Sequence, residues 1–579
     1  MRINIYASEG LLAHDNTRLK QNGFGARLNS FLSEKSGVAI NAQGVRGNVI
    51  AADNVIQALL SNDCSNYYSL VTHPCHVPKM TARFASSEQI TIRSLEEWTN
   101  SCRNDLAGDI WFVPLMGMNN LEGPELSHRL RSLNGNSIYP IVTLTHGLSY
   151  RRGFYDFFLR TMLEGTISCD AIICTSRASE GALRKLLLEV PQSFNRATGA
   201  SLSYRGRIVR IPLCVDTDLL HPQDKRPLRR KLKIPPTALL VVTLGRISPL
   251  KGDLRSLIRT FASLIHRHPH KDLRLVVAGT EEKGYVRYLQ EEAEAFGVGQ
   301  RITFMLDISD SVKGDLLAAA DIFVSVTDTL EESFGLTPVE AMACGVPQVV
   351  SDWSGYRDTV AHGETGFCIP TYWSKCDSDL TATAFFLGSV YDHALLGQTV
   401  ALDLQSLHQH LELLVEAPQL RMEMSVSSRR RAVEMFSYSA IVKQYAALWI
   451  ESAGLTSRAR EDKVHNPFGL GELPYSDLFS GYAKYFFDED TRLQRVANTI
   501  WPPTRAPYFT GPFEAFNVLD TSLLGTLLDT LGDSNKSLAF GDLVGEVSLA
   551  VSVHPDAIRR HVMWLIKNGF VNPLGAWGK

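Results

Sequence analysis

The strongest constraint on the fold is an alternation of short apolar runs with amphipathic segments, which occurs twice along the chain. The first series ends near residue 225 and includes INIYA, DIWFVPL, PIVTLTH, DAIICTS and GRIVRIPL. The second begins near residue 240 and includes LLVVTLGR, LRLVVAG, RITFML, DIFVSV and PQVVSD. Short apolar strands that alternate with helices are typical of parallel sheets. The sequence therefore predicts an α/β protein with two doubly wound, Rossmann-like domains facing a cleft.

These domains can be given boundaries. We assign residues 1–225 to an N-terminal Rossmann-like domain and residues 226–435 to a second, C-terminal one. GARLNSFLSEKSG and RRGFYDFFLRTMLEG are expected helices of the first domain, and residues 371–398 an irregular insertion in the second. Residues 436–455 form a long amphipathic helix. The carboxyl ends of the strands, along the cleft, are the expected ligand site.

The remaining residues differ in composition. Residues 456–515 are rich in Pro, Gly and aromatics, as in WPPTRAPYFTGPF, and are predicted to be a linker. Residues 516–579 contain three helical patterns and a tail strand, and Gly569 follows the last helix as a C′ glycine does. This pattern predicts a small, mainly helical, winged-helix-like domain.

Composition excludes several classes of protein. The net charge is −3, which gives no electrostatic case for nucleic-acid binding. The 9 cysteines include no CxxC pair, which argues against a disulfide framework or a zinc site. The sequence shows no signal peptide and no apolar run of about 20 residues, so we expect a cytoplasmic protein without a transmembrane segment.

The stretch EESFGLTPVEAMACGVP has two interpretations. In the first, Thr337 to Glu340 form a capping box with an early proline, and Gly345 ends the helix. In the second, the helix start attracts a phosphate, and Gly335 lets the backbone approach a ligand closely. Glu332 would then accept hydrogen bonds from sugar hydroxyls and Glu340 from ribose hydroxyls. Such a site suits a nucleotide-diphosphate sugar.

The same stretch resembles the E-x7-E region of the retaining glycosyltransferases of family 4, which have the two-domain GT-B architecture. Glu332, and not Glu331, has the correct spacing to Glu340. LGRISPLKG resembles the family's phosphate clamp, which implicates Arg246 and Lys251. RIPLCVDTDLLHP resembles the interdomain segment, with Leu-Cys where Asn-Gly is usual. MFSYSAIVKQYAALW resembles the family's final helix, which implies that residues 436–455 cross back to the first domain. CDAIICTSRAS and HGETGFCIP match further segments in order, so the resemblance covers roughly residues 1–455.

The resemblance implies that residues 1–225 form the acceptor-side domain and residues 226–435 the nucleotide-sugar donor domain. It also implies a role for each candidate residue of the site. Arg246 and Lys251 would neutralise the charge of the leaving diphosphate. Glu332 would be the acidic residue of the catalytic group, where it binds the sugar hydroxyls without acting as a nucleophile. His146, at a strand end, would hydrogen-bond the donor sugar. Backbone N–H groups would contact the donor at three further groups of residues: Gly23 and Gly25; Gly335; and Phe334, Leu336 and Thr337.

The resemblance also implies the chemistry. A hexosyltransferase-like enzyme would retain the anomeric configuration, with the diphosphate oxygen accepting the acceptor's proton. No DxD motif follows a suitable strand, and DED at 488–490 lies in the expected linker. We therefore expect a metal-independent reaction with no cofactor and with a nucleotide-diphosphate sugar, such as a UDP-sugar, as the donor.

The acceptor stays open at this point. Residues 516–579 could dock a peptide or protein acceptor by strand addition, form a homodimer, or pack within the chain. A polysaccharide or lipid-linked acceptor, with peripheral membrane contact, is an alternative. So is a nucleotide-sugar-sensing regulator that binds DNA, although Asp542, Glu546 and Asp556 offset Arg559, Arg560 and Lys567.

Overall fold

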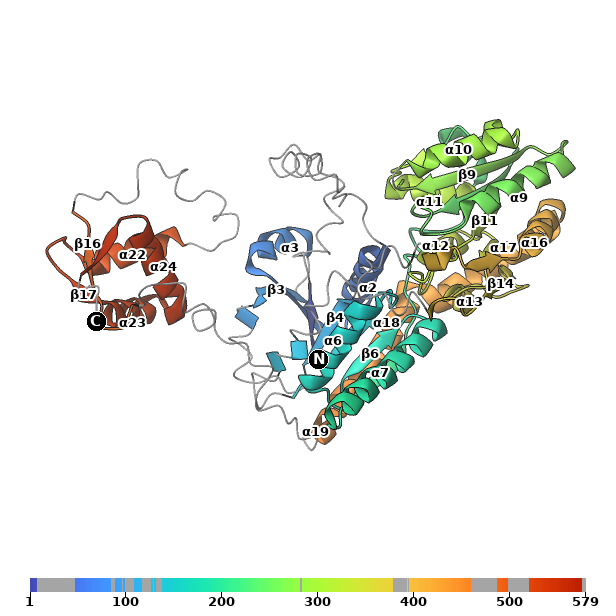
Figure 1. The fold of residues 1–579 in the computed structure, drawn as a ribbon. Coiled ribbons are helices and arrows are strands. Elements are labelled where there is room, and N and C mark those ends of the chain that lie inside the picture. Colours follow the sequence, from blue (N-terminus) through green and yellow to red (C-terminus); the bar gives the residue numbers. More distant parts are fainter. Residues whose placement is uncertain are drawn as a thin grey trace. The chain divides into compact units, whose positions relative to one another are not determined.

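The computed structural model describes residues 1–7, 47–84, 89–95, 97–98, 109–116, 127–128, 130–131, 138–281, 284–378, 393, 395–459, 487–497 and 520–574. The chain divides into two compact units. The first comprises Met1–Thr72 and Lys79–Gly469, and the second comprises His73–Pro78 and Leu470–Lys579. The first unit contains both Rossmann-like domains (Figure 1). The expected helix over GARLNSFLSEKSG lies outside the described residues.

The first domain is built on a seven-stranded sheet of order β3-β2-β1-β4-β5-β6-β7, in which every pairing is parallel. Its strands are β1 (Arg2–Tyr6), β2 (Tyr67–Thr72), β3 (Ile90–Ser94), β4 (Ile110–Met116), β5 (Ile141–Thr145), β6 (Ala171–Cys174) and β7 (Arg207–Arg210). The helices along this stretch are α2 (Gly47–Asn62), η3 (Pro74–His76), α3 (Val77–Phe84), α6 (Arg151–Leu163) and α7 (Arg177–Thr198). Every residue of β4 and β5 is buried, as in a central strand that is covered on both faces.

The second domain has a six-stranded parallel sheet of order β10-β9-β8-β11-β12-β13. Its strands are β8 (Leu239–Leu244), β9 (Leu273–Gly279), β10 (Ile302–Leu306), β11 (Ile322–Ser325), β12 (Gln348–Ser351) and β13 (Gly366–Ile369). Its helices are α8 (Lys225–Lys231), α9 (Leu254–Arg267), α10 (Tyr285–Ala295), η4 (Gly299–Arg301), α11 (Asp310–Ala319), α12 (Leu336–Ala343), α13 (Tyr356–Thr359), α16 (Leu404–Glu416) and α17 (Pro418–Phe436).

The ten strands predicted from the sequence are therefore confirmed, and so is the doubly wound α/β class. In the second sheet the strand order reverses at β8, which lies between β9 and β11. The loops that follow β8 and β11 lie on opposite sides of this reversal, where open α/β sheets bind ligands. The first loop carries Arg246 and Lys251, and the second carries Glu332.

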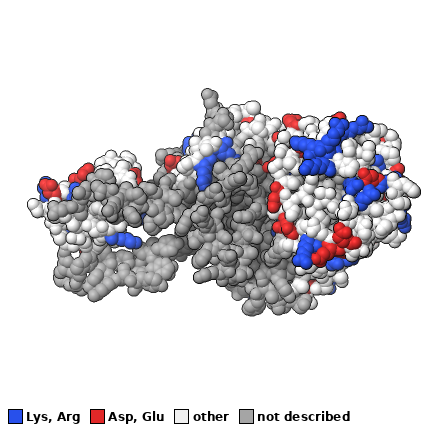
Figure 2. Space-filling view, turned by 90° about the horizontal axis from the view of Figure 1, so that it is seen from above, with Lys and Arg blue, Asp and Glu red and all other residues white. Residues whose placement is uncertain are grey.

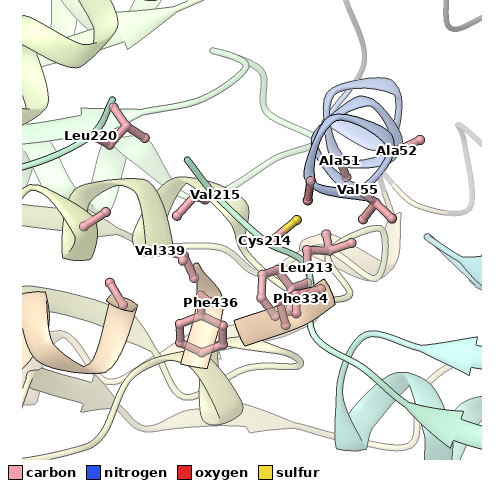
Figure 3. Close-up of a cluster of buried hydrophobic side chains, with 14 of the residues drawn as sticks. Ala51, Ala52, Val55, Leu213, Cys214, Val215, Leu220, Phe334, Val339 and Phe436 are labelled. Carbon is pink, nitrogen blue, oxygen red and sulfur yellow. The ribbon is translucent and has the colours of Figure 1, made fainter. Parts of the chain in front are cut away.

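A continuous hydrophobic cluster joins the two sheets within the first unit. It includes Ile5 of β1, Val242 of β8, Val339 of α12 and Phe436 of α17. Figure 3 shows Leu213, Cys214 and Val215 of the connecting segment between α2 on one side and Phe334 and Phe436 on the other. The Leu-Cys pair that departs from the family's usual Asn-Gly thus serves as core.

Helix α18 (Tyr438–Gly454) returns to the first domain, as the sequence predicts. Its Trp449 ring lies 5.3 Å from the Phe112 ring of β4, and its Tyr445 ring lies 5.6 Å from the same ring. The short helix α19 (Thr456–Ala459) follows. Aromatic side chains of this size contribute much of the apolar burial in a core, so α18 fastens the end of the second domain to the first.

Residues near the expected insertion are more regular than predicted. Strand β14 (Thr371–Trp373) pairs antiparallel with β15 (Val400–Leu402). The irregular assignment for 371–398 is thus wrong at its start, because Thr371 to Trp373 find a partner that lies beyond the segment. Most of the intervening residues, 379–392, lie outside the described part of the chain.

The second unit contains the three predicted helices, α22 (Thr521–Leu531), α23 (Phe540–Val551) and α24 (Pro555–Lys567), and the tail strand β18 (Val571–Leu574). Gly569 has φ +75° after α24, as a C′ glycine requires. Strands β16 (Arg492–Arg495) and β17 (Leu538–Ala539) were not predicted. Strand β16 lies in the middle of the sheet and pairs antiparallel with both β17 and β18. The module thus extends back into the expected linker, and Leu493 lies in its core.

Charge is mixed on the described surface. Figure 2 shows a group of Lys and Arg side chains on one face of the second Rossmann-like domain, with acidic side chains on the same face. Charged side chains of this domain are often paired: Arg255 and Arg259 of α9, for example, both bind Glu292 of α10 at 2.7 Å. Among the described helices, none is long and apolar enough to cross a membrane.

Candidate functional site

Three loops at the carboxyl ends of strands supply the described part of the candidate site. Arg246 and Lys251 follow β8, Glu331 and Glu332 follow β11, and His146 and Tyr150 follow β5 of the first domain. The loop after β8 lies against the loop after β11, because Gly252 packs on the backbone of Val326. A Cβ at Gly252 would lie 2.6 Å from the Val326 carbonyl oxygen, so this approach requires glycine.

The two predicted cations meet at one carboxylate, that of Glu331. Arg246 Nη2 donates to Glu331 Oε2 at 2.9 Å, and Lys251 Nζ lies 3.5 Å from the same oxygen. The other oxygen, Oε1, accepts a hydrogen bond from the Tyr150 hydroxyl at 2.9 Å and lies 3.4 Å from His393 Nδ1. Glu331 is therefore held from both domains.

The electrostatics of this cluster follow from its geometry. Burial by itself would raise the pKa of Glu331, but His393, Lys251, Arg246 and Tyr150 together hold that pKa far below its ordinary value. Glu331 is 15% exposed, whereas Arg246 is 43% exposed and Lys251 is 27% exposed. The cluster is thus a fixed anion beside two cations that solvent can reach.

The sequence analysis assigns no role to Glu331, because its spacing to Glu340 does not fit the E-x7-E motif. Tyr150 and His393 were missed as well, because no local pattern marks either as a partner of the β11 loop. The buried ring of His393 lies 4.9 Å from the Tyr150 ring, nearly edge-on. A signal that could have been used is the acidic doublet itself, since two adjacent side chains on a loop point in different directions.

Glu332 lies beside the start of α12. Its Oε1 accepts the backbone N–H of Phe334 at 3.3 Å, and its carbonyl oxygen accepts the Ser354 hydroxyl at 2.6 Å. The phenol of Tyr356 is close enough for Glu332 to contribute, after burial, to a pKa for Tyr356 well above the ordinary value. The structure therefore orients Glu332 through its neighbours without pairing it with Arg246 or Lys251.

Helix α12 begins two residues earlier than the capping-box interpretation requires. Its first residue is Leu336, and Gly335 is the N-cap with φ +94° and no side-chain cap. The predicted box from Thr337 to Glu340 is therefore wrong, because both residues lie inside the helix. Gly345, with φ +71°, follows the helix as predicted.

Glu340 is instead the partner of a half-buried lysine. Lys313 of α11 donates to Glu340 Oε1 at 2.8 Å, and Glu340 is almost fully buried. Thr337 and Leu336 are partly buried at the helix start. The Phe334 side chain is core, with its ring 5.9 Å from that of Phe436 (Figure 3). The Phe334 ring is therefore enclosed in the core, so the predicted donor contacts of this stretch would have to come from its backbone groups.

His146 is buried at the end of β5, where its Nε2 lies 3.0 Å from the Pro114 carbonyl oxygen. A carbonyl can only accept, so Nε2 carries the proton of the neutral ring and Nδ1 is an acceptor. Burial lowers the pKa of His146 to about 4, and the bond to Pro114 opposes this shift. Gly23 and Gly25, the other candidates from the first domain, lie outside the described residues.

One further group in the β11 loop is perturbed. Burial, followed by the charge of Asp253, raises the pKa of Asp328 to about 7. Asp253 is the N-cap of α9, where it accepts the backbone N–H of Ser256 at 3.1 Å. The loop that carries Glu331 and Glu332 thus contains a carboxyl that titrates near neutrality.

A cavity of about 690 Å³ opens elsewhere in the first unit. Arg177 of α7 contacts Asp358 of α13 at its rim, and Arg431 also lines it. None of the predicted donor residues lines this cavity. The convergence of Arg246, Lys251 and Glu332 on the strand ends therefore defines the candidate site.

Comparison with known proteins agrees with this geometry. Residues 224–378 match the family described as glycosyl transferases group 1. Arg246, Lys251, Glu332 and Glu340 all lie within the matched range, and His146 lies outside it. The match therefore covers most of the second Rossmann-like domain, including the loops after β8 and β11.

Curated relatives match over a similar range. D-inositol 3-phosphate glycosyltransferase 2 of Catenulispora acidiphila is 36% identical over 166 residues, which are 28% of this chain and 38% of that protein. D-inositol 3-phosphate glycosyltransferase of Rhodococcus jostii is 36% identical over 157 residues, which are 27% of this chain and 34% of that protein. The chain thus matches about a third of the length of these relatives.

The similarity in fold extends further than the similarity in sequence. The structure of a sucrose-phosphate synthase from Thermosynechococcus elongatus aligns with a TM-score of 0.50 and 16% identity, and the alignment covers 78% of this chain and 98% of that one. The predicted GT-B fold is therefore confirmed, with two Rossmann-like domains in the first unit.

Proposed function

We propose that the chain is a retaining glycosyltransferase that moves a sugar from a nucleotide-diphosphate sugar to an acceptor. The observation that carries this proposal is that Arg246 and Lys251, after β8, both lie against Glu331, the neighbour of Glu332 in the loop after β11. This contact lies at the strand reversal of the domain that matches glycosyl transferases group 1. Two cations at the end of β8 suit a diphosphate, and the carboxylate beside α12 suits sugar hydroxyls.

Each group has a task in this proposal. Arg246 and Lys251 stabilise the charge that develops on the leaving diphosphate. Glu332 accepts hydrogen bonds from the donor sugar, and the Nδ1 atom of His146 accepts another. Glu340 Oε1 is engaged by Lys313, so Oε2 is the oxygen that we assign to the ribose hydroxyls. Closure of the two domains positions the reactants and excludes water.

The bond changes balance without an enzyme nucleophile. The bond between the anomeric carbon and the diphosphate oxygen breaks, and the acceptor oxygen forms a bond to that carbon on the same face. The acceptor proton passes to the departing diphosphate oxygen. Retention of configuration follows from this front-face geometry.

We propose that the reaction needs no metal, because Arg246 and Lys251 supply the positive charge. Within the described residues, His268, Glu412 and Glu416 form a group that could hold an ion. His268 lies just past the end of α9, and Lys251 lies before its start. The 14 residues of this helix separate the two sites by about 20 Å. Arg267 also lies 3.3 Å from Glu412 and already compensates its charge.

The acceptor is proposed to be a peptide or protein that docks on the second unit. In its described sheet, β17 and β18 are the outer strands, and an outer strand offers unpaired backbone groups to an extended peptide. Polysaccharide and lipid-linked acceptors are the alternatives. DNA is disfavoured, because Arg559 of α24 is paired with Asp556 at 2.9 Å and with Glu489 at 2.8 Å.

The test is slow donor hydrolysis by the full chain against a panel of UDP-, GDP- and ADP-sugars, with and without a chelator. Arg246→Ala and Glu332→Ala should each lower the rate with the preferred donor by about 100-fold or more. Arg255→Ala is the matched control, because Arg255 is also a paired arginine of this domain but faces Glu292. A protein that binds none of the three nucleotides would refute the proposal.

A further inference from the structure

We infer that Glu331 is an internal counter-ion that competes with the donor diphosphate for Arg246 and Lys251, and that it thereby lowers the affinity of the site for diphosphates. The inference rests on the proposed function, which assigns the two cations to the donor. It goes further by giving a role to an acid that stands one residue before the E-x7-E spacing.

Glu331 and a donor diphosphate would compete because both would bind the same side-chain nitrogens of Arg246 and Lys251. Glu331 Oε2 lies 2.9 Å from Arg246 Nη2 and 3.5 Å from Lys251 Nζ, so one oxygen atom bridges the two cations. A diphosphate oxygen held by the same pair would need the same position, because both kinds of oxygen accept N–H donors at similar distances. The carboxylate and the diphosphate therefore exclude one another at this point.

Charge adds to this exclusion. Glu331 is ionised and largely enclosed, and a diphosphate brought to the same cations carries charge of the same sign. Like charges a few ångströms apart repel strongly where protein replaces water. Two cations with one internal anion leave a net charge of about +1, whereas two cations alone would present about +2.

Contacts of the second carboxylate oxygen, Oε1, fix the position of the Glu331 side chain. The Tyr150 hydroxyl donates to Oε1 at 2.9 Å, and His393 Nδ1 lies 3.4 Å from the same oxygen. Tyr150 lies in the loop after β5, four residues after His146, so a residue of the first domain helps to fix the Glu331 side chain. Loss of the Tyr150 hydroxyl should weaken this hold and make Glu331 easier to displace.

Competition and mere orientation predict opposite signs. If Glu331 only orients Arg246 and Lys251, its removal frees two long side chains that must be ordered again on binding, and affinity falls. If Glu331 competes, its removal strengthens binding. Glu331→Gln preserves the shape and the acceptor oxygen, and it removes the charge.

The experiment measures the binding of inorganic pyrophosphate and of UDP to the full chain by calorimetry. Pyrophosphate needs the two cations but no nucleotide pocket, so it reports on the inference separately from the proposed function. We expect Glu331→Gln to bind both ligands about tenfold more tightly than the natural protein. Tyr150→Phe should shift both affinities in the same direction by a smaller factor.

Glu292→Gln is the matched control, since Glu292 is also a carboxylate between two arginines, Arg255 and Arg259. Its affinity for pyrophosphate should equal that of the natural protein. Unchanged or weaker pyrophosphate binding by Glu331→Gln would overturn the inference, even where UDP binds normally. Tighter pyrophosphate binding without any nucleotide binding would support the inference and refute the proposed function.

Discussion

Lys313 Nζ lies 2.8 Å from Glu340 Oε1, and this pair joins α11 to α12 beneath the candidate donor site. The Lys313 side chain is 19% exposed and that of Glu340 is 5% exposed. Burial by itself would lower the pKa of Lys313, but the charge of Glu340 raises that pKa above its ordinary value. The lysine therefore stays charged and compensates an enclosed carboxylate.

Replacing Lys313 with methionine should destabilise the protein by about 3 kcal/mol, because Glu340 would then be buried without its cation. The measurement is urea unfolding of the full chain, followed through the transition of the first unit. Arg287→Met is the control: its partner Glu291 is on the same helix surface, and both side chains are exposed. Equal stability of the two variants would mean that Glu340 does not depend on Lys313.

Gly335→Ala should impair both stability and donor binding. Gly335 has φ +94°, and a Cβ there would lie 2.2 Å from Tyr356 Cε1. The Tyr356 ring is buried, and its hydroxyl lies 2.7 Å from Ser325 Oγ, so it cannot move aside easily. The start of α12 would shift together with the backbone groups proposed for the donor.

Gly363→Ala is the control that separates the steric clash with Tyr356 from the strain of alanine at a positive φ. Gly363 has φ +81° and no atom within 4 Å of the added Cβ, so alanine should cost only about 1 kcal/mol there. Thermal unfolding and UDP calorimetry of both variants provide the comparison. The prediction fails if Gly335→Ala behaves like Gly363→Ala in both measurements.

Asp328 predicts a pH-dependent difference in stability. Its pKa is about 7 in the folded chain, against an ordinary value of 3.8, so folding favours its neutral form. The unfolded chain ionises first as the pH rises, and the resulting penalty on folding grows from about pH 4 to pH 7 and is constant above pH 7. Three pKa units correspond to a penalty of about 4 kcal/mol at most.

Asp328→Asn should therefore be more stable than the natural protein at pH 8 and equal to it at pH 4. Chemical unfolding at several pH values gives the difference, in which the titration of all other groups cancels. A difference that stays constant with pH would show that Asp328 titrates normally.

His146 should remain neutral over the working range of pH, because its pKa is about 4. The pH profile of donor turnover should then have no step from His146 between pH 5.5 and pH 8. His146→Gln should lower the whole profile without changing its shape. The glutamine amide can still donate to the Pro114 carbonyl oxygen, but it places no acceptor where Nδ1 of the histidine lies. A step that disappears in this variant would contradict the assignment.

The sequence by itself determined most of the sheet framework. Strands such as DIWFVPL and LLVVTLGR are largely apolar on both faces, so their hydrophobic pattern alone predicts buried strands. It did not determine β2, β3 or β16. Strand β16 reads RLQR, in which Leu493 is the one apolar residue, and it is a strand because β17 and β18 pair with it on both sides. Pairing between distant segments is a tertiary effect that no local pattern records.

The sequence also predicted that Arg246 and Lys251 follow a strand and that Glu332 precedes a helix start, and both positions agree with the structure, because strand and helix boundaries are marked locally in the sequence. Only the tertiary structure decided which charges meet. Glu331 is bound by Arg246, 85 residues earlier, and by Tyr150, 181 residues earlier. For Glu340 the sequence allowed a helix cap or a ribose ligand, and neither interpretation predicted the Lys313 that the fold brings beside it. Side-chain partners are chosen by packing across elements, and packing is settled only when the whole chain has folded.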